Sequence, residues 1–195
     1  MINSVPRILA FAGSARRESF NKKLIRVAAQ AAELAGAEVT LIDLRDFPMP
    51  IYDGDLEAEQ GIPENGLKFR TLLKSHSSLL ISTPEYNSSL PPLLKNTLDW
   101  ASRPVGTEDG LLPYEGKLAS ILSASPGALG GLRSLLQLRA MLSNIGVIVL
   151  PDQLAVGRAH EAFGENGQLK NQHQQGTVTE IAVSLVQWTK RALEN

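Results

Sequence analysis

Residues 7–21, which read RILAFAGSARRESFN, join an apolar run to a short polar loop and the start of a helix. The run Arg7–Ala12 is almost wholly apolar, which is typical of a strand covered on both faces of a parallel sheet. The helical pattern begins at Asn21 and continues to Leu34. A strand that leads through a short loop into a helix is the building unit of α/β folds, so this stretch predicts that class.

The polar loop of residues 13–21 carries the groups of an anion site. The first N–H groups of a helix have no partners within the helix, and the helix dipole favours negative charge there. Ser14, Ser19 and Asn21 add side-chain donors. Arg16 adds a planar guanidinium that suits phosphate, so the loop predicts a cradle for a monophosphate group. An ordinary helix start, with Ser19 or Asn21 as the cap and Arg16 in solvent, uses the same residue types.

Apolar strand-like runs continue to alternate with helical patterns along the chain. The expected strands are Arg7–Ala12, Glu38–Asp43, Ser78–Ser82, Leu118–Ser123 and Val147–Leu150. The expected helices are Asn21–Leu34, Gly66–Lys74, Pro91–Ala101, Gly131–Asn144 and Gly176–Leu193. Strands that are each followed by a helix predict a doubly wound, five-stranded parallel sheet in one domain over residues 1–195. Gly36 and Gly146 fall between a helix and a strand, where helices commonly end.

Two stretches have no apolar period and are expected to be loops. Asp46–Asn65 is rich in Pro, Asp, Glu and Gly, and Gly157–Gln175 is polar and contains glycine. The first stretch is long for an α/β connection, and such loops often border a site. A solvated acidic loop is an equally good interpretation of that stretch, and the second carries no motif that assigns it a role.

Composition excludes several classes of function. The formal net charge is −1, and the chain has no basic stripe of the kind that binds nucleic acid. Cysteine is absent, and the three histidines are too far apart in sequence to suggest a metal site. No apolar run approaches the roughly 18 residues of a membrane-spanning helix, and no signal region opens the chain. We therefore expect no bound metal, no nucleic-acid partner, no membrane insertion and a cytoplasmic location.

Three polar loops follow the first, third and fourth expected strands, at residues 13–21, 83–91 and 123–131. In open parallel sheets, ligands bind at the carboxyl ends of the strands, where the strand order reverses. These loops are rich in Ser, Asn, Gly and Pro, and they hold neither a histidine nor a pair of carboxylates. This composition suits a planar ligand with polar edges better than acid–base or nucleophilic chemistry, so we expect no catalytic side chain.

On these motifs the chain resembles the flavodoxin-like NADPH-dependent FMN reductases, a family that includes chromate, quinone and azo-dye reductases. The first motif is G-S-x-R-x-x-S-x-N at residues 13–21, and the second is P-E-Y-N-x-S-L-P-x-L-L-K-N-x-L-D-W at residues 84–100. A third, S-x-G-x-x-G-G, spans residues 125–131. The second motif is long and specific. Ser88 departs from the pattern, since many members have glycine there, beside the flavin ring.

The resemblance implies a flavodoxin-like fold of three α/β/α layers and an FMN cofactor. The residues expected to hold FMN are, at its phosphate, Ser14, Arg16, Ser19, Phe20 through its N–H, and Asn21; along the isoalloxazine ring, Pro84, Glu85, Tyr86 and Asn87; and on the other side of the ring or at the ribityl chain, Ser123 and Ser125. Family members are usually dimers or tetramers, which implies a homodimer or homotetramer here.

The same resemblance implies an NAD(P)H-dependent oxidoreductase with a ping-pong cycle. NADPH or NADH would donate a hydride to FMN and leave, and the reduced flavin would then pass electrons to a small-molecule acceptor. The implied acceptors are quinones, azo compounds, metal oxyanions such as chromate, and free flavin. Because no G-x-G-x-x-G follows a strand, we expect the nicotinamide nucleotide to bind transiently. The sequence selects neither the physiological acceptor nor NADPH over NADH.

The alternative function is that of an electron-carrier flavodoxin, which binds FMN but does not oxidise NAD(P)H. Carrier flavodoxins tend to be strongly acidic and to have a phosphate loop without arginine, so the near-neutral charge and Arg16 argue against that function. A third interpretation is a scaffold domain that has lost flavin. The complete set of Ser14, Arg16, Ser19 and Asn21 argues against it.

Overall fold

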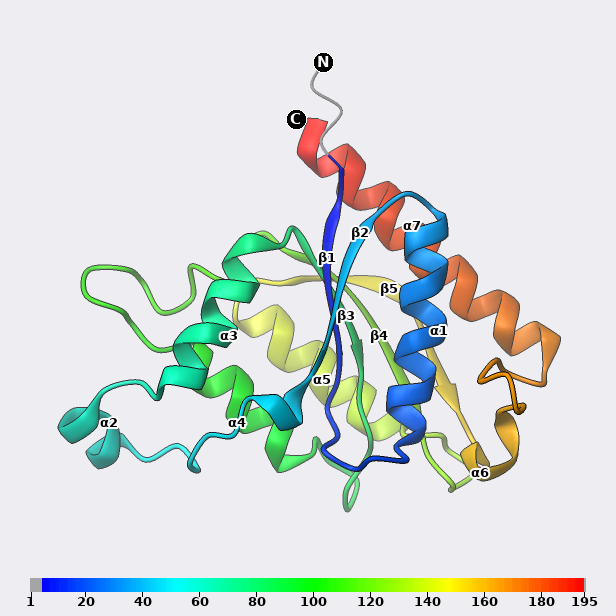
Figure 1. Ribbon diagram of the computed structural model, residues 1–195, viewed down its shortest axis with the longest axis horizontal. Coiled ribbons are helices and arrows are strands. Elements are labelled where there is room, and N and C mark those ends of the chain that lie inside the picture. The colour runs from blue at the N-terminus through cyan, green and yellow to red at the C-terminus, as the bar shows by residue number, and fades with distance from the viewer. Residues whose placement is uncertain (1–4, 195) are drawn as a thin grey trace.

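The computed structural model describes residues 5–194, and in that range five parallel strands form one sheet in the order β2-β1-β3-β4-β5 (Figure 1). The strands are β1 Arg7–Ala12, β2 Glu38–Asp43, β3 Ser78–Ser82, β4 Leu118–Ala124 and β5 Ile148–Val156. This order is that of a flavodoxin-like doubly wound fold, whose strand order reverses between β1 and β3. The expected fold class is confirmed, and the first three strands have the predicted bounds.

Helices cover both faces of the sheet and complete the three layers. They are α1 Phe20–Leu34, α2 Gly54–Gln60, α3 Glu64–Ser75, α4 Pro92–Ala101, α5 Leu132–Asn144, α6 Ala159–Ala162 and α7 Gln172–Glu194, with a short 3₁₀ helix, η1, at Leu44–Asp46. α1 and α7 lie side by side on one face, whereas α3, α4 and α5 cover the other (Figure 1). Within residues 5–194, no helix combines the length and the apolar character needed to cross a bilayer.

Strand β1 contributes side chains to two apolar cores, one on each face of the sheet, because its alternate side chains point to opposite faces. Ile8 and Ala10 pack in the core beneath α1 and α7. Leu9 and Phe11 pack in the core beneath α3, α4 and α5. All four side chains are fully buried, which explains why the strand has a continuous apolar run rather than an alternating pattern.

The glycines that follow α1 and α5 end those helices as expected. Gly36 and Gly146 have φ angles of 92° and 90°, in the left-handed region that glycine adopts without a steric penalty. After α1, the Gly36 N–H bonds the Glu33 carbonyl at 2.9 Å and the Ala37 N–H bonds the Ala32 carbonyl at 3.1 Å. This pair of bonds is the Schellman motif, which satisfies the last carbonyl groups of a helix.

The stretch Asp46–Asn65, expected to be a loop, contains η1's last residue, the helix α2 and the start of α3. The side chain of Asp53 caps α2 by accepting a hydrogen bond from the Asp55 N–H at 2.9 Å. None of the residues of α2 is buried. An exposed helix needs no apolar period, which is why the pattern did not reveal it.

The stretch Gly157–Gln175, also expected to be a loop, contains α6 and the first turn of α7. The Asn171 side chain accepts hydrogen bonds from the N–H groups of His173 and Gln174, at 2.9 and 3.1 Å. This cap starts α7 ahead of Gly176, where the helix was expected to begin. Glycine is tolerated inside a helix at a cost, so it was a misleading boundary signal.

Strand β5 is longer than the expected Val147–Leu150 because it continues past Pro151. The pairs that flank a register shift are Ala119 with Val149 and Ile121 with Gln153. The step is two residues in β4 and four in β5, so β5 carries two extra residues at the shift. This bulge accommodates Pro151, which has no N–H to donate, on a strand that pairs on one side only.

Candidate functional site

A cavity of about 140 Å³ lies where the loops after β1, β3 and β4 meet, at the carboxyl edge of the sheet. Its lining residues are Ser14, Arg16, Ser19, Phe20, Asn21, Pro84, Glu85, Tyr86, Ala124, Ser125 and Pro126. The fold therefore brings together most of the residues that the sequence singled out. Asn87 and Ser123 do not line the cavity, and the sequence did not point to Ala124 or Pro126. A larger groove of about 640 Å³ between α1 and α7 contains none of these residues.

The cavity begins at the amino end of α1, where two serine hydroxyls are turned toward the loop. Ser19 is the N-cap, and its Oγ accepts a hydrogen bond from the Lys22 N–H at 3.4 Å. Ser14 Oγ accepts from the Arg16 N–H at 3.3 Å. In both bonds the hydroxyl oxygen is the acceptor, so each hydroxyl keeps its hydrogen for a further acceptor. A helix start with two such donors suits a small anion.

Arg16 is an exposed side chain at the rim of this cavity. Its Nη2 donates to the Glu18 carbonyl at 2.5 Å, and its guanidinium carbon lies 5.0 Å from the centre of the Phe20 ring. Within residues 5–194, no carboxylate forms an ion pair with it. The guanidinium is therefore held beside the start of α1 with its charge available to an anion.

Asn21 joins the three loops to one another. Its Oδ1 accepts from the Ser82 hydroxyl at 2.8 Å and from the Ala124 N–H at 2.9 Å. Its Nδ2 donates to the Ala124 carbonyl at 2.8 Å. The side chain thus fixes α1 against the ends of β3 and β4, a structural role that the sequence alone did not predict.

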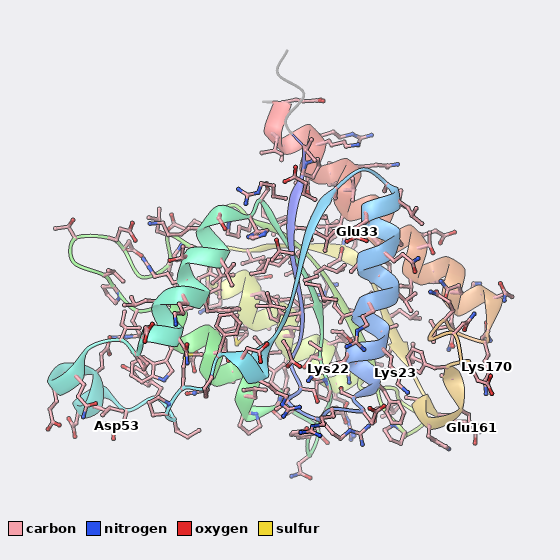
Figure 2. All side chains as sticks on the ribbon, viewed as in Figure 1. Lys22, Lys23, Glu33, Asp53, Glu161 and Lys170 are labelled. Atoms are coloured by element: carbon pink, nitrogen blue, oxygen red, sulfur yellow. The ribbon has the colours of Figure 1, made fainter. Side chains whose placement is uncertain are left out.

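Lys22 points away from the cavity toward β2, whereas Lys23 lies on the opposite side of α1 (Figure 2). Lys22 Nζ lies 2.5 Å from Asp43 Oδ2. Burial acts to raise the pKa of the Asp43 carboxyl, but the hydrogen bonds from Lys22 and from the Arg45 N–H outweigh burial, so this pKa lies below its usual value. Arg16 is therefore the cation that serves the cavity, and Lys22 serves the edge of the sheet.

The loop after β3 forms a tight hairpin beside the cavity. Tyr86 and Ser89 exchange backbone hydrogen bonds of 3.1 and 3.0 Å. Between them, Asn87 and Ser88 have φ angles of 50° and 68°, as two-residue hairpin turns require. The backbone at position 88 is thus in the left-handed conformation, which glycine adopts easily. The same turn forms here with Ser88. Tyr86 is half exposed at the cavity rim.

The first turns of α5 clamp this hairpin through side chains that sequence reasoning missed. Glu85, whose side chain is 7% exposed, accepts from the Arg133 N–H at 3.1 Å and from Arg133 Nε at 2.7 Å. Gln137 donates to the Ser88 carbonyl at 2.8 Å and accepts from the Ser89 hydroxyl at 2.6 Å. One feature of the sequence could have predicted these contacts: Arg133 and Gln137 are four residues apart, which places both on one face of a helix that starts at the carboxyl edge of the sheet.

The loop after β4 contributes Ser125 to the cavity, whereas Ser123 lies beneath it. Ser123 is completely buried, and its hydroxyl donates to the Thr83 carbonyl at 2.6 Å. Ser125 Oγ accepts from the Gly127 N–H at 3.4 Å. Packing explains two of the third motif's glycines, because a Cβ on Gly131 would lie 1.9 Å from Ser123 Oγ and one on Gly130 would lie 2.7 Å from backbone atoms of β5. Ser123 could contact a ligand only if the side chains and backbone around its buried hydroxyl moved apart. The FMN contacts expected of the other residues stay predictions.

Comparison with known proteins agrees with this geometry. The family described as NADPH-dependent FMN reductase matches residues 6–161. A quinone reductase from Pseudomonas putida is 33% identical over 172 residues, which cover 87% of this chain and 88% of that protein. An NAD(P)H-dependent FMN reductase from Pseudomonas aeruginosa is 32% identical over 186 residues, covering 95% of this chain and 96% of that protein. The solved structure of FerB, a flavoenzyme NAD(P)H:(acceptor) oxidoreductase from Paracoccus denitrificans, has a TM-score of 0.80 at 28% identity and covers 96% of this chain and 98% of that chain.

Proposed function

Since the chain belongs to the NADPH-dependent FMN reductase family, we propose that it binds FMN and oxidises NAD(P)H to reduce quinones and related small acceptors. The observation that carries the proposal is the cavity at the start of α1. The amino end of α1, the two serine hydroxyls and Arg16 form a donor set that matches a phosphate ester.

The size of the cavity supports a binding mode in which the phosphate of FMN lies inside the cavity and the flavin ring lies outside it. About 140 Å³ accommodates a phosphate and part of a ribityl chain but is small for a flavin ring. The ring would lie outside, along the hairpin of residues 84–89, where the half-exposed Tyr86 offers an aromatic surface. One face of the ring would stay open to solvent there, and this suits transient binding by a nicotinamide and then by an acceptor.

When bound, FMN would supply the redox chemistry, by taking a hydride from NAD(P)H and passing the electrons on in a ping-pong cycle. The side chains of this chain bind and orient. Within the cavity lining there is no histidine, and the carboxylate of Glu85 is held by Arg133. We therefore assign no acid–base residue.

The proposal extends to azo compounds, chromate and free flavin as further acceptors. It also includes a homodimer or homotetramer and a cytoplasmic location.

Anaerobic addition of NADPH to the FMN-loaded protein tests the proposal. We expect the flavin absorbance to bleach on NADPH or NADH and to return when a quinone is added. A flavin spectrum that stays oxidised with both nucleotides would favour an electron-carrier flavodoxin. A protein that takes up no FMN would contradict the assignment of the residue 13–21 loop. Rates with quinones, an azo dye and chromate then rank the acceptors.

A further inference from the structure

The segment after β5 has no role in the proposed binding of FMN, and the family match ends at residue 161, within α6. We propose that Phe163, just beyond that match, is a positioning residue for the phosphate-binding arginine, Arg16. The inference rests on the proposed function. It also gives the segment of residues 157–171 a role, which is to fix the side chains at the start of α1 before the phosphate arrives.

A row of stacked groups leads from Phe163 to Arg16. The rings of Phe163 and Phe20 are 3° from parallel, with their centres 6.4 Å apart. The guanidinium carbon of Arg16 lies 5.0 Å from the centre of the same Phe20 ring. Arginine stacks on aromatic faces, and a ring that is itself held by a second ring has less freedom to turn. Removing Phe163 would therefore loosen the surface on which Arg16 lies.

Hydrogen bonds hold the backbone around Phe163 in place. It pairs with Leu169 as an antiparallel bridge, and the Gly164 N–H bonds the Gln168 carbonyl at 2.9 Å. The resulting hairpin of residues 163–169 is anchored by the buried Leu169, whose N–H donates to the Gln175 side chain at 3.0 Å. Since Gln175 belongs to α7, the hairpin is tied to the core of the fold.

Farther along α1, the hairpin makes a separate polar contact, in which the Gln168 side chain donates to the Gln30 side chain at 3.0 Å. A cavity of about 340 Å³ separates the rest of the hairpin from α1, and it is lined by Lys23, Arg26 and residues 164–168 among others. In Figure 2, Lys23 lies on the side of α1 that faces Glu161 and Lys170, which flank this hairpin. The Phe163–Phe20 stack is thus the contact through which the segment acts on the start of α1.

The test compares FMN with riboflavin, because only FMN carries the phosphate that Arg16 would bind. Titration of the flavin-free chain, followed by flavin fluorescence, gives a Kd for each ligand. We expect Phe163→Leu to weaken FMN binding by about three- to tenfold and to change riboflavin binding by less than about twofold. Phe163→Tyr keeps the ring and should bind FMN as the unaltered chain does.

Phe47→Leu is the matched control, because Phe47 is also partly buried and lies against another phenylalanine, Phe69, at 6.0 Å. This pair is in the opposite core, so both Kd values should be unchanged. In a Phe20→Leu background, the further change Phe163→Leu should have little effect on FMN, because the row of stacked groups is already broken.

Two outcomes would overturn this inference alone: FMN binding within about twofold of the unaltered chain in Phe163→Leu, or equal weakening of FMN and riboflavin, which would indicate a merely structural role. If Phe163→Leu does not fold, as judged by circular dichroism, Phe163→Met keeps most of the apolar volume and takes its place. Failure of the unaltered chain to bind either flavin would overturn the proposed function together with this inference.

Discussion

Gly131 is a residue of the site where there is little room for a side chain. Its φ angle is 93°, and an added Cβ would lie 1.9 Å from the buried Ser123 Oγ. We expect Gly131→Ala to lower the free energy of unfolding by about 2–4 kcal/mol, since a left-handed alanine is strained and the neighbouring serine must move. Urea denaturation measures the loss. Gly116→Ala is the control, because Gly116 has a φ of 72° but no atom within 4 Å of the added Cβ. Equal losses in both variants would contradict the packing argument.

Residue types predicted which side chains lie together at one cavity better than they predicted the hydrogen-bond partners of each side chain. Ser14, Ser19 and Arg16 lie where the loop motif placed them, around one cavity. Asn21 also lies there, but its amide bonds Ser82 and Ala124, and those partners are distant in sequence. A single sequence shows which groups can donate hydrogen bonds, whereas tertiary contacts decide which acceptors they meet.

At the scale of elements, the hairpin of residues 84–89 and the start of α5 behave as one unit. Arg133 holds Glu85 by its backbone N–H and its guanidinium. We expect Arg133→Gln to loosen the hairpin and to weaken FMN and riboflavin by the same factor, about two- to fivefold, because the ring along the hairpin is common to both ligands. Fluorescence titration with both flavins checks this expectation.

Arg139→Gln is the control for that prediction, since Arg139 lies on the same helix but donates to the Val149 and Leu150 carbonyls of β5. It should lower stability and leave both flavin affinities unchanged. If Arg133→Gln weakened FMN but not riboflavin, the clamp would act on the phosphate end of the site, contrary to the placement of the ring.

The elements that the sequence missed share a physical cause. β1 and β3 are central strands that are almost wholly buried, and they were predicted to the residue because they carry a continuous apolar signal. The bounds of β2 were also predicted, although β2 is an edge strand with no buried residue. α2 is exposed and held by its cap, and β5 continues through a bulge at Pro151. A polar helix held by its cap has no apolar period, and a bulge interrupts the apolar run of an edge strand. A prediction based on that period therefore omits α2 and ends β5 too early.

At the scale of the whole molecule, His76 couples stability to pH. It is buried between α3 and β2, where Nδ1 donates to the Leu72 carbonyl and Nε2 accepts from the Thr40 hydroxyl, each at 2.7 Å. Burial lowers the pKa of His76 below its ordinary value. The folded state therefore binds a proton less readily than the unfolded state. The resulting stability is present above about pH 6.5 and is lost as the pH falls toward the lowered value.

We therefore expect the urea midpoint to fall between about pH 6.5 and pH 5, and to fall less steeply in His76→Gln. His173→Gln, at the exposed start of α7, is the control and should follow the unaltered chain. An identical pH slope in His76→Gln and the unaltered chain would show that other groups carry the effect.

The central claim is that the loop of residues 13–21 binds the phosphate of FMN, and the affinity of Arg16→Ala for FMN and riboflavin tests it most directly. Because Arg16 lies on an exposed loop, its replacement should leave folding nearly unchanged. We predict that FMN binding weakens by about 1.5–3 kcal/mol, or roughly ten- to 150-fold, while riboflavin binding stays the same. An unchanged FMN affinity in Arg16→Ala would contradict the claim.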